Sequence, residues 1–93
     1  MDLLTMQMEF LRMEAPLMLK HLSQAATARH FETIAITAHR LAGLLGTFDD
    51  RLGSELARRI ENQAQANSTS GLNALISQVA ERLENHLVAC QES

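Results

Sequence analysis

Residues 34–48 read IAITAHRLAGLLGTF, an apolar run with a single histidine near its middle. On a helix, at about 100° per residue, the apolar side chains of this run and of the residue at position 31 gather on one side. They are Phe31, Ile34, Ala38, Leu41 and Leu45. This stripe predicts a helix that buries one face in a core. His39 lies about 120° from the centre of the stripe, so we expect its ring at the edge of the buried face or in solvent.

Small residues surround His39 on this predicted helix. Its neighbours one turn before it and one and two turns after it are Ala35, Ala42, Gly43 and Gly46. Together they leave open space around the ring. A glycine inside a helix costs roughly 1 kcal/mol relative to alanine, so Gly43 indicates close approach by another molecule. The alternative is a surface histidine beside a loosely packed helix end, with Gly46 as the C-cap.

The composition is typical of one small helical domain. Of the 93 residues, 46% are hydrophobic and 20% are charged, Trp and Tyr are absent, and Pro occurs once. Leu, Ala, Glu, Gln, Arg and Met dominate, and these residues favour helices over sheets. The length suits a single domain over residues 1–93.

Charge and hydropathy exclude several classes of partner. A net charge of −3, without a Lys/Arg cluster or interleaved aromatic residues, argues against nucleic acid. No apolar run approaches the roughly 20 residues that a membrane span needs, so no direct membrane contact is expected. The single Cys90 cannot form a disulfide within the chain, which is typical of a cytoplasmic protein.

The first predicted helix begins near Leu4. Its apolar positions alternate steps of four and three; they are Leu4, Met8, Leu11, Ala15, Met18, Leu22 and Ala25. A second stripe is expected to widen the buried face toward another neighbour; its members are Leu3, Met6, Phe10, Met13 and Leu17. Pro16 removes one helical hydrogen bond and clashes with the preceding turn. We therefore expect a kink or a break into two helices near residues 13–15.

Two more helices follow the central one. Asp49 or Asp50 can cap the third helix by accepting from its free N–H groups, and the polar loop Asn67–Gly71 separates it from the last helix. Their apolar positions recur at threes and fours; they are Leu52, Leu56, Ile60 and Ala64, then Leu72, Ile76, Val79, Leu83, Leu87 and Cys90. Four amphipathic helices with short connections predict an all-α, antiparallel up-and-down four-helix bundle.

The chemistry available to such a bundle centres on one histidine. The four histidines, His21, His30, His39 and His86, fall on different segments in no metal-ligand pattern, so no metal site is predicted. No Gly-rich phosphate loop is present, which argues against a self-contained ATP-using enzyme or a bound cofactor. A neutral histidine can accept a group covalently, for example as a phosphoramidate. An exposed His39 would serve as a carrier, with catalysis supplied by its partner.

Residues 38–43 read AHRLAG, and Phe48, Ala57, Ile60 and Glu61 follow. Together they resemble the histidine phosphotransfer (HPt) domain of two-component phosphorelays. That family's pattern is Ala-His-x-Leu-Lys-Gly, then a Gly-rich turn, then an Ala-x-x-Leu-Glu helix. The resemblance extends upstream to the family's first long helix, on Phe10, Leu11, Glu14, Pro16, Leu19, Leu22 and Ala25. It therefore covers nearly the whole chain.

The resemblance implies that His39 accepts a phosphoryl group on Nε2 from the aspartate of a receiver domain and passes it to another receiver. The chain would be free-standing or the terminal module of a hybrid sensor kinase. Ile36 lies on the solvent side, one turn before the histidine, and has no core to fill, so we expect the partner to bury it. The expected docking residues are Ala35, Ile36, Arg40, Ala42, Gly43 and Gly46.

Four positions depart from the family pattern, and at two of them, Leu44 and Leu45, the family usually has smaller residues. Ala42 stands where the family has a lysine thought to help neutralise the phosphoryl group, and Asp49 stands where it has a turn glycine. The missing lysine motivates a second hypothesis, an HPt-like adaptor that is not phosphorylated and only docks a receiver or kinase. A third is a plain structural or dimerisation domain. Incubation with a phosphorylated receiver distinguishes the three hypotheses.

Overall fold

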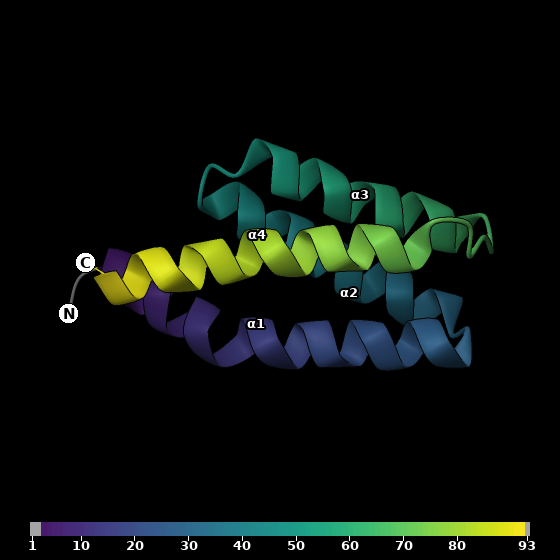
Figure 1. The fold of residues 1–93 in the computed structure, drawn as a ribbon, viewed down its shortest axis with the longest axis horizontal. Coiled ribbons are helices and arrows are strands. Elements are labelled where there is room, and N and C mark those ends of the chain that lie inside the picture. The colour runs from purple at the N-terminus through teal and green to yellow at the C-terminus, as the bar shows by residue number, and fades with distance from the viewer. Residues whose placement is uncertain (1–2, 93) are drawn as a thin grey trace.

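The fold is a bundle of four helices, which a computed structural model describes for residues 3–92 (Figure 1). The helices are α1 (Leu3–Ala28), α2 (Phe31–Thr47), α3 (Arg51–Gln65) and α4 (Leu72–Glu92). Consecutive helices run in opposite directions, and α1 also packs against α4, which closes the ring. The all-α antiparallel up-and-down bundle expected from the sequence is confirmed. Side chains are described within residues 3–88 except at six positions, Leu4, Thr5, Gln7, Met8, Phe10 and Leu11. Five residues that the sequence predicts to be buried therefore have side chains outside the described part: Leu4, Met8, Phe10, Leu11 and Cys90.

Pro16 kinks α1 without dividing it. The helix is continuous from Leu3 to Ala28, and its first turns are inclined to the rest of it in Figure 1. A proline inside a helix costs one hydrogen bond and pushes the preceding turn aside, which bends the axis. Of the two outcomes expected near residues 13–15, the structure has the kink.

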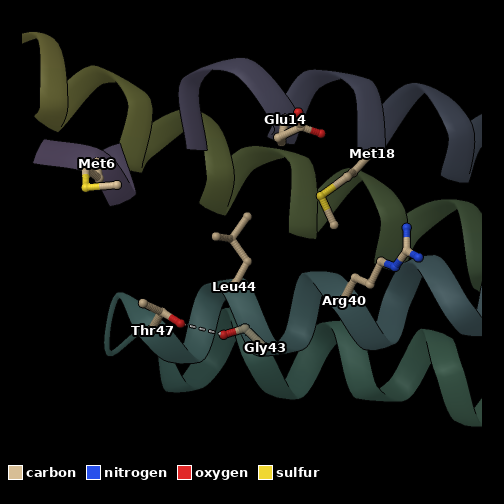
Figure 2. Close-up of a pocket in the computed structure, with 7 residues that line it drawn as sticks. All are labelled: Met6, Glu14, Met18, Arg40, Gly43, Leu44 and Thr47. Carbon is tan, nitrogen blue, oxygen red and sulfur yellow. Dashed lines mark hydrogen bonds between the residues drawn. The ribbon is translucent and has the colours of Figure 1, made fainter. Parts of the chain in front are cut away.

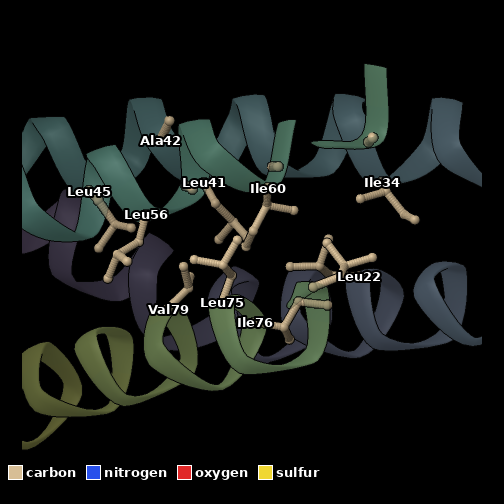
Figure 3. Close-up of a cluster of buried hydrophobic side chains, with 14 of the residues drawn as sticks. Leu22, Ile34, Leu41, Ala42, Leu45, Leu56, Ile60, Leu75, Ile76 and Val79 are labelled. Carbon is tan, nitrogen blue, oxygen red and sulfur yellow. The ribbon is translucent and has the colours of Figure 1, made fainter. Parts of the chain in front are cut away.

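The core is aliphatic and receives side chains from all four helices. Figure 3 shows Leu22 of α1, Leu41 of α2, Ile60 of α3 and Val79 of α4 among the side chains that fill it, and all four are fully buried. The stripe predicted on α2 is confirmed for Ile34, Ala38, Leu41 and Leu45, which are all inaccessible to solvent, and its fifth member Phe31 is half-buried against the core. The face of α2 that carries His39 is thereby fixed toward the outside.

Two predictions about burial were wrong. The second stripe on α1 does not widen the core, because its described members Leu3, Met6, Met13 and Leu17 are all exposed. Leu52 on α3 is exposed as well, and Gly53 and Ser54 beside it are buried instead. At this first turn α3 presents small residues to α2, so the large side chain of Leu52 is left on the outer face.

Three helices end on a residue other than glycine in the left-handed region. These residues are Arg29 (φ 57°), Asp49 (φ 56°) and Asn67 (φ 53°). At the end of α2 the Asp49 N–H donates to the carbonyl of Gly46 and the Asp50 N–H to that of Leu45, both at 3.0 Å. This pair of bonds is the Schellman motif. Helix α2 therefore runs to Thr47 with Phe48 as its C-cap, and the expectation that Gly46 caps it was wrong.

Asp50 joins the α2–α3 turn to α4. Its carboxylate caps α3 by accepting from the Gly53 N–H at 2.8 Å, and it accepts from Arg82 at 2.8 and 3.0 Å and from His86 Nε2 at 2.8 Å. Of the two capping candidates, Asp50 is the one used. A Cβ on Gly53 would come within 2.7 Å of the carboxylate, so only glycine fits beneath it. Phe48 also packs against the His86 ring at 5.6 Å between centroids.

The charge of Asp50 is favoured despite its burial at 4% exposure. Burial alone would raise the pKa of the carboxyl, but the hydrogen bonds from Arg82, the Gly53 N–H and His86 outweigh it and lower the pKa from 3.8 to about 2. A carboxyl whose pKa is lower in the folded chain stabilises the fold above its unfolded pKa. That stabilisation is lost as the pH falls from about 4 toward 2.

We predict that Asp50→Asn lowers the free energy of unfolding by about 2 kcal/mol at pH 7, because the neutral amide forfeits the charge-assisted bonds. Urea denaturation of both proteins at several pH values measures the difference. It should shrink between about pH 4 and pH 2 as the wild-type carboxyl is protonated. Asp49→Asn, at the exposed neighbouring carboxyl, is the control and should change little. Equal losses from the two variants, or a loss that does not vary with pH, would contradict this account of Asp50.

Candidate functional site

His39 stands on the outer face of α2, where α3 supplies its partner. The histidine side chain is 77% exposed, and its Nδ1 lies 3.1 Å from Oε2 of Glu61, which is 21% exposed. Glu61 follows Ile60 directly, and the burial of Ile60 fixes the side of α3 from which the carboxylate extends. The exposed histidine expected from the helical pattern is confirmed.

The contact with Glu61 determines which ring nitrogen of His39 is reactive. A carboxylate can only accept a hydrogen bond, so the neutral ring carries its proton on Nδ1 and donates it to Glu61. The lone pair then resides on Nε2, the nitrogen on the far side of the ring. A carboxylate on Nδ1 also stabilises positive charge that develops when Nε2 forms a bond. The pair is suited to nucleophilic attack through Nε2.

A shallow hollow of about 330 Å³ lies beside the histidine, between α2 and α3. Its lining residues are His39, Ala42 and Gly43 from α2 and Arg58, Glu61 and Asn62 from α3. Arg58, which carries a guanidinium, and Asn62, which carries an amide, therefore line the same hollow as His39. Both groups are hydrogen-bond donors that suit an anionic group. Arg58 also lines a neighbouring hollow of about 500 Å³, together with Asp49 and Glu55.

Ala42 forms the floor of this hollow. It is only 6% exposed, and its carbonyl oxygen accepts a hydrogen bond from the Ser54 hydroxyl of α3 at 3.0 Å. The small side chain lets α3 approach closely at this point. A partner that docks here would contact the rim of the hollow more than Ala42 itself.

The two glycines after the histidine face open space. A Cβ at either Gly43 or Gly46 would meet no atom within 4 Å. Packing inside this chain therefore gives no reason for glycine at these helical positions, although each weakens the helix by roughly 1 kcal/mol relative to alanine. The Thr47 hydroxyl donates to the Gly43 carbonyl at 3.0 Å, one turn later. The structure thus leaves room for another molecule beside His39, as the sequence predicted.

The other predicted docking residues differ in how exposed their side chains are. Ile36 is 49% exposed, as expected for an apolar residue outside the core. Ala35 is half-buried and packs against the core. Arg40 is exposed but faces another hollow, away from the one that His39 lines.

That second hollow, of about 660 Å³, lies between α1 and α2. Figure 2 shows Met18 of α1 and Leu44 of α2 reaching into it, with the Arg40 side chain beside them. Met6, Glu14, Gly43 and Thr47 complete its lining. Gly43 borders this hollow as well as the one beside His39, so an apolar surface with a flexible methionine adjoins the His39 site.

Within the side chains that the structure describes, no three or more His, Cys, Asp or Glu residues gather in a way that could hold a metal ion. No helix in the described part of the chain has both the length and the apolar character needed to cross a membrane.

Nothing in the sequence indicated that Arg58 lies beside His39. Helical spacing assigned no partner on another helix to Arg58 or to Glu61. Arg58 and Glu61 are three residues apart, which puts both on one side of a helix. Spacing alone could show that they share a side, but the α2–α3 register was needed to place that side next to His39.

We predict that neutral His39 carries its proton on Nδ1 and that Glu61→Ala removes this preference. Ring ¹⁵N chemical shifts near pH 8 measure which nitrogen is protonated. In the variant the shifts should move toward those of exposed His21, because the carboxylate no longer accepts from Nδ1. Glu55→Ala, at an exposed carboxylate earlier on α3, should leave His39 unchanged. Identical ring shifts for His39 and His21 in the wild-type chain would refute the assignment.

Comparisons of the chain with protein-family models, with curated proteins and with solved structures found no match. The resemblance to HPt domains therefore remains a prediction from the sequence. What bears on function in the structure is the geometry of His39, Glu61 and the hollow beside them.

Proposed function

We propose that this chain is a phosphorelay carrier, which accepts a phosphoryl group on Nε2 of His39 from a receiver-domain aspartate and passes it to another receiver. The observation that carries the proposal is the His39–Glu61 contact. It occupies Nδ1 and leaves Nε2 free on a side chain that is 77% exposed. The open space at Gly43 gives a receiver room to approach.

The transfer of the phosphoryl group to His39 needs no separate base to remove a proton. The Nε2 lone pair of neutral His39 attacks phosphorus, and the bond between phosphorus and the aspartyl oxygen breaks. The aspartate leaves as a carboxylate with the bonding electrons. The Nδ1 proton stays in place, so the phosphorylated ring carries a positive charge that the Glu61 carboxylate faces. The reverse steps return the group to a receiver.

In this proposal the partner supplies the catalysis. Phosphoryl transfer depends on positioning and on electrostatic stabilisation of the equatorial oxygens. A rigid helix with an oriented histidine contributes the positioning. The receiver contributes the catalytic groups around its own aspartate, so this chain acts as a carrier and not as an enzyme.

A second candidate function is an adaptor that docks a receiver or kinase without becoming phosphorylated. The observation in its favour is Ala42, which brings no positive charge to the hollow beside His39. The hollow near Met18 and Leu44 and the exposed Ile36 could bury apolar area against a partner with no chemistry at all.

Incubation with receiver domains charged by acetyl phosphate tests the carrier proposal. We predict that a cognate receiver phosphorylates the chain, that the product is labile in acid and stable in base, and that His39→Gln abolishes it. Mass spectrometry of proteolytic peptides locates the group. Transfer to His21, His30 or His86 instead would overturn the assignment to His39. Tight binding without transfer would favour the adaptor.

If a receiver docks on α2, it buries Ile36. We therefore predict that Ile36→Glu weakens receiver binding roughly tenfold or more, because a charge replaces apolar surface that the partner buries. Binding by titration calorimetry and stability by thermal melting are measured together, and the melting temperature should not change. Leu52→Glu, the same substitution at an exposed position on α3, should leave binding intact. Equal weakening by both variants, or a lowered melting temperature for Ile36→Glu alone, would show that Ile36 is not a docking residue.

A further inference from the structure

Among the residues that line the hollow beside His39, Arg58 is the one with a permanent positive charge. We propose that Arg58, from α3, binds the phosphoryl group on His39 and neutralises its charge across the helix pair. This inference rests on the proposed function and adds to it the anion-binding residue. The ligand class is a phosphoryl dianion on the Nε2 side of the ring. A guanidinium can give two parallel N–H donors to two of its oxygens.

The antiparallel register of α2 and α3 places Arg58 at this site. His39 pairs with Glu61 at 3.1 Å. In two antiparallel helices, a step forward along one helix matches a step backward along the other. Ala42 lies three residues after His39 on α2, and Arg58 lies three residues before Glu61 on α3, so Ala42 and Arg58 are neighbours across the helix pair. Both residues line the same hollow, as the register requires. The space above the short Ala42 side chain is therefore available to the guanidinium of Arg58.

Neighbouring arginines are less well placed. Arg40 follows His39 directly but lies about 100° around the helix, and it lines the Met18 side of α2. Arg59 is exposed and adjacent to Arg58 but does not line the hollow. Of these three arginines, Arg58 is the one that lines the hollow beside His39, and it also borders the hollow near Asp49 and Glu55.

Glu61 makes a cation necessary. Its carboxylate stabilises the positive ring but repels a phosphoryl dianion on the same histidine. Arg58 lies one turn earlier on α3 and lines the same hollow, so its positive charge offsets this repulsion. Asn62 adds a neutral amide donor to the same wall. Together these residues give a phosphoryl group two partners of suitable chemistry.

The test loads the whole chain with phosphoramidate, a small phosphoryl donor that needs no receiver. The Nε2 lone pair of histidine attacks phosphorus, the bond to the donor nitrogen breaks, and ammonia leaves. Exposed His21 and His30 are labelled as well, so each molecule carries its own reference sites. Phosphopeptide mass spectrometry follows the lifetime of each phosphohistidine, and ³¹P resonances follow its protonation with pH.

In Arg58→Gln the phosphoryl lifetime on His39 should fall roughly two- to fivefold. The pH midpoint of its ³¹P shift should rise, because a nearby cation favours the dianion. His21 and His30 should be unaffected. Arg59→Gln, the same change one residue along α3, should alter neither quantity, and both effects should weaken at high salt. Circular dichroism checks that each variant keeps its helicity.

A charge-retaining variant separates the positive charge from the structural role of the side chain. In Arg58→Lys the same exposed position keeps a cation, so the lifetime and the ³¹P midpoint of His39 should stay closer to wild type than in Arg58→Gln. Equal behaviour of Arg58→Gln and Arg59→Gln, or a lifetime in Arg58→Lys as short as in Arg58→Gln, would overturn the role of Arg58. Such a result would leave His39 as a carrier, whereas absence of transfer from any receiver would overturn the proposed function itself.

Discussion

The close packing of α2 against α3 is the constraint on which the rest of this structure depends. This helix pair makes the most extensive contact in the bundle, and small buried residues such as Ala38, Ala42 and Ala57 permit it. A hydrogen bond from Ser54 to the Ala42 carbonyl fixes the register. That register brings Glu61 to Nδ1 of His39 and gives Arg58 and Ala42 a common hollow. Larger side chains at these contacts would separate the helices and dismantle the site.

The turn between the two helices is held from the opposite side of the bundle. Asp50 caps α3, and Arg82 and His86 of α4 bind the same carboxylate. These bonds offset the cost of burying a charge, which is why the pKa of Asp50 falls to about 2 in spite of that burial. The face of α2 and α3 that carries His39 and Glu61 and this network on α4 therefore share one element, the turn between the two helices. Stability and site geometry are coupled through it.

The sequence predicted much of this arrangement, for identifiable reasons. The 3.6-residue period of α2 located both its buried stripe and the exposed His39, because a single helix determines which residues share a face. Contacts between helices were harder to foresee. The Asp50–Arg82–His86 network joins residues more than thirty positions apart, and helical spacing carries no information on such pairs. The turns ending at Arg29, Asp49 and Asn67 lack the glycine that usually marks a left-handed residue. The prediction that the second stripe on α1 is buried was wrong, because the spacing of apolar residues does not distinguish a core face from an exposed one.

We propose that α2 and α3 present a histidine that can both accept and release a phosphoryl group. The most direct test of this proposal is the return step. The chain is loaded on His39, freed of donor and mixed with unphosphorylated receiver domains, and the fate of the group is followed by ³¹P spectroscopy. A carrier transfers the group to a receiver aspartate, so the signal of phospho-His39 falls as that of the aspartyl phosphate appears. Decay of phospho-His39 at its own hydrolysis rate with every receiver tested, yielding only inorganic phosphate, would contradict the account.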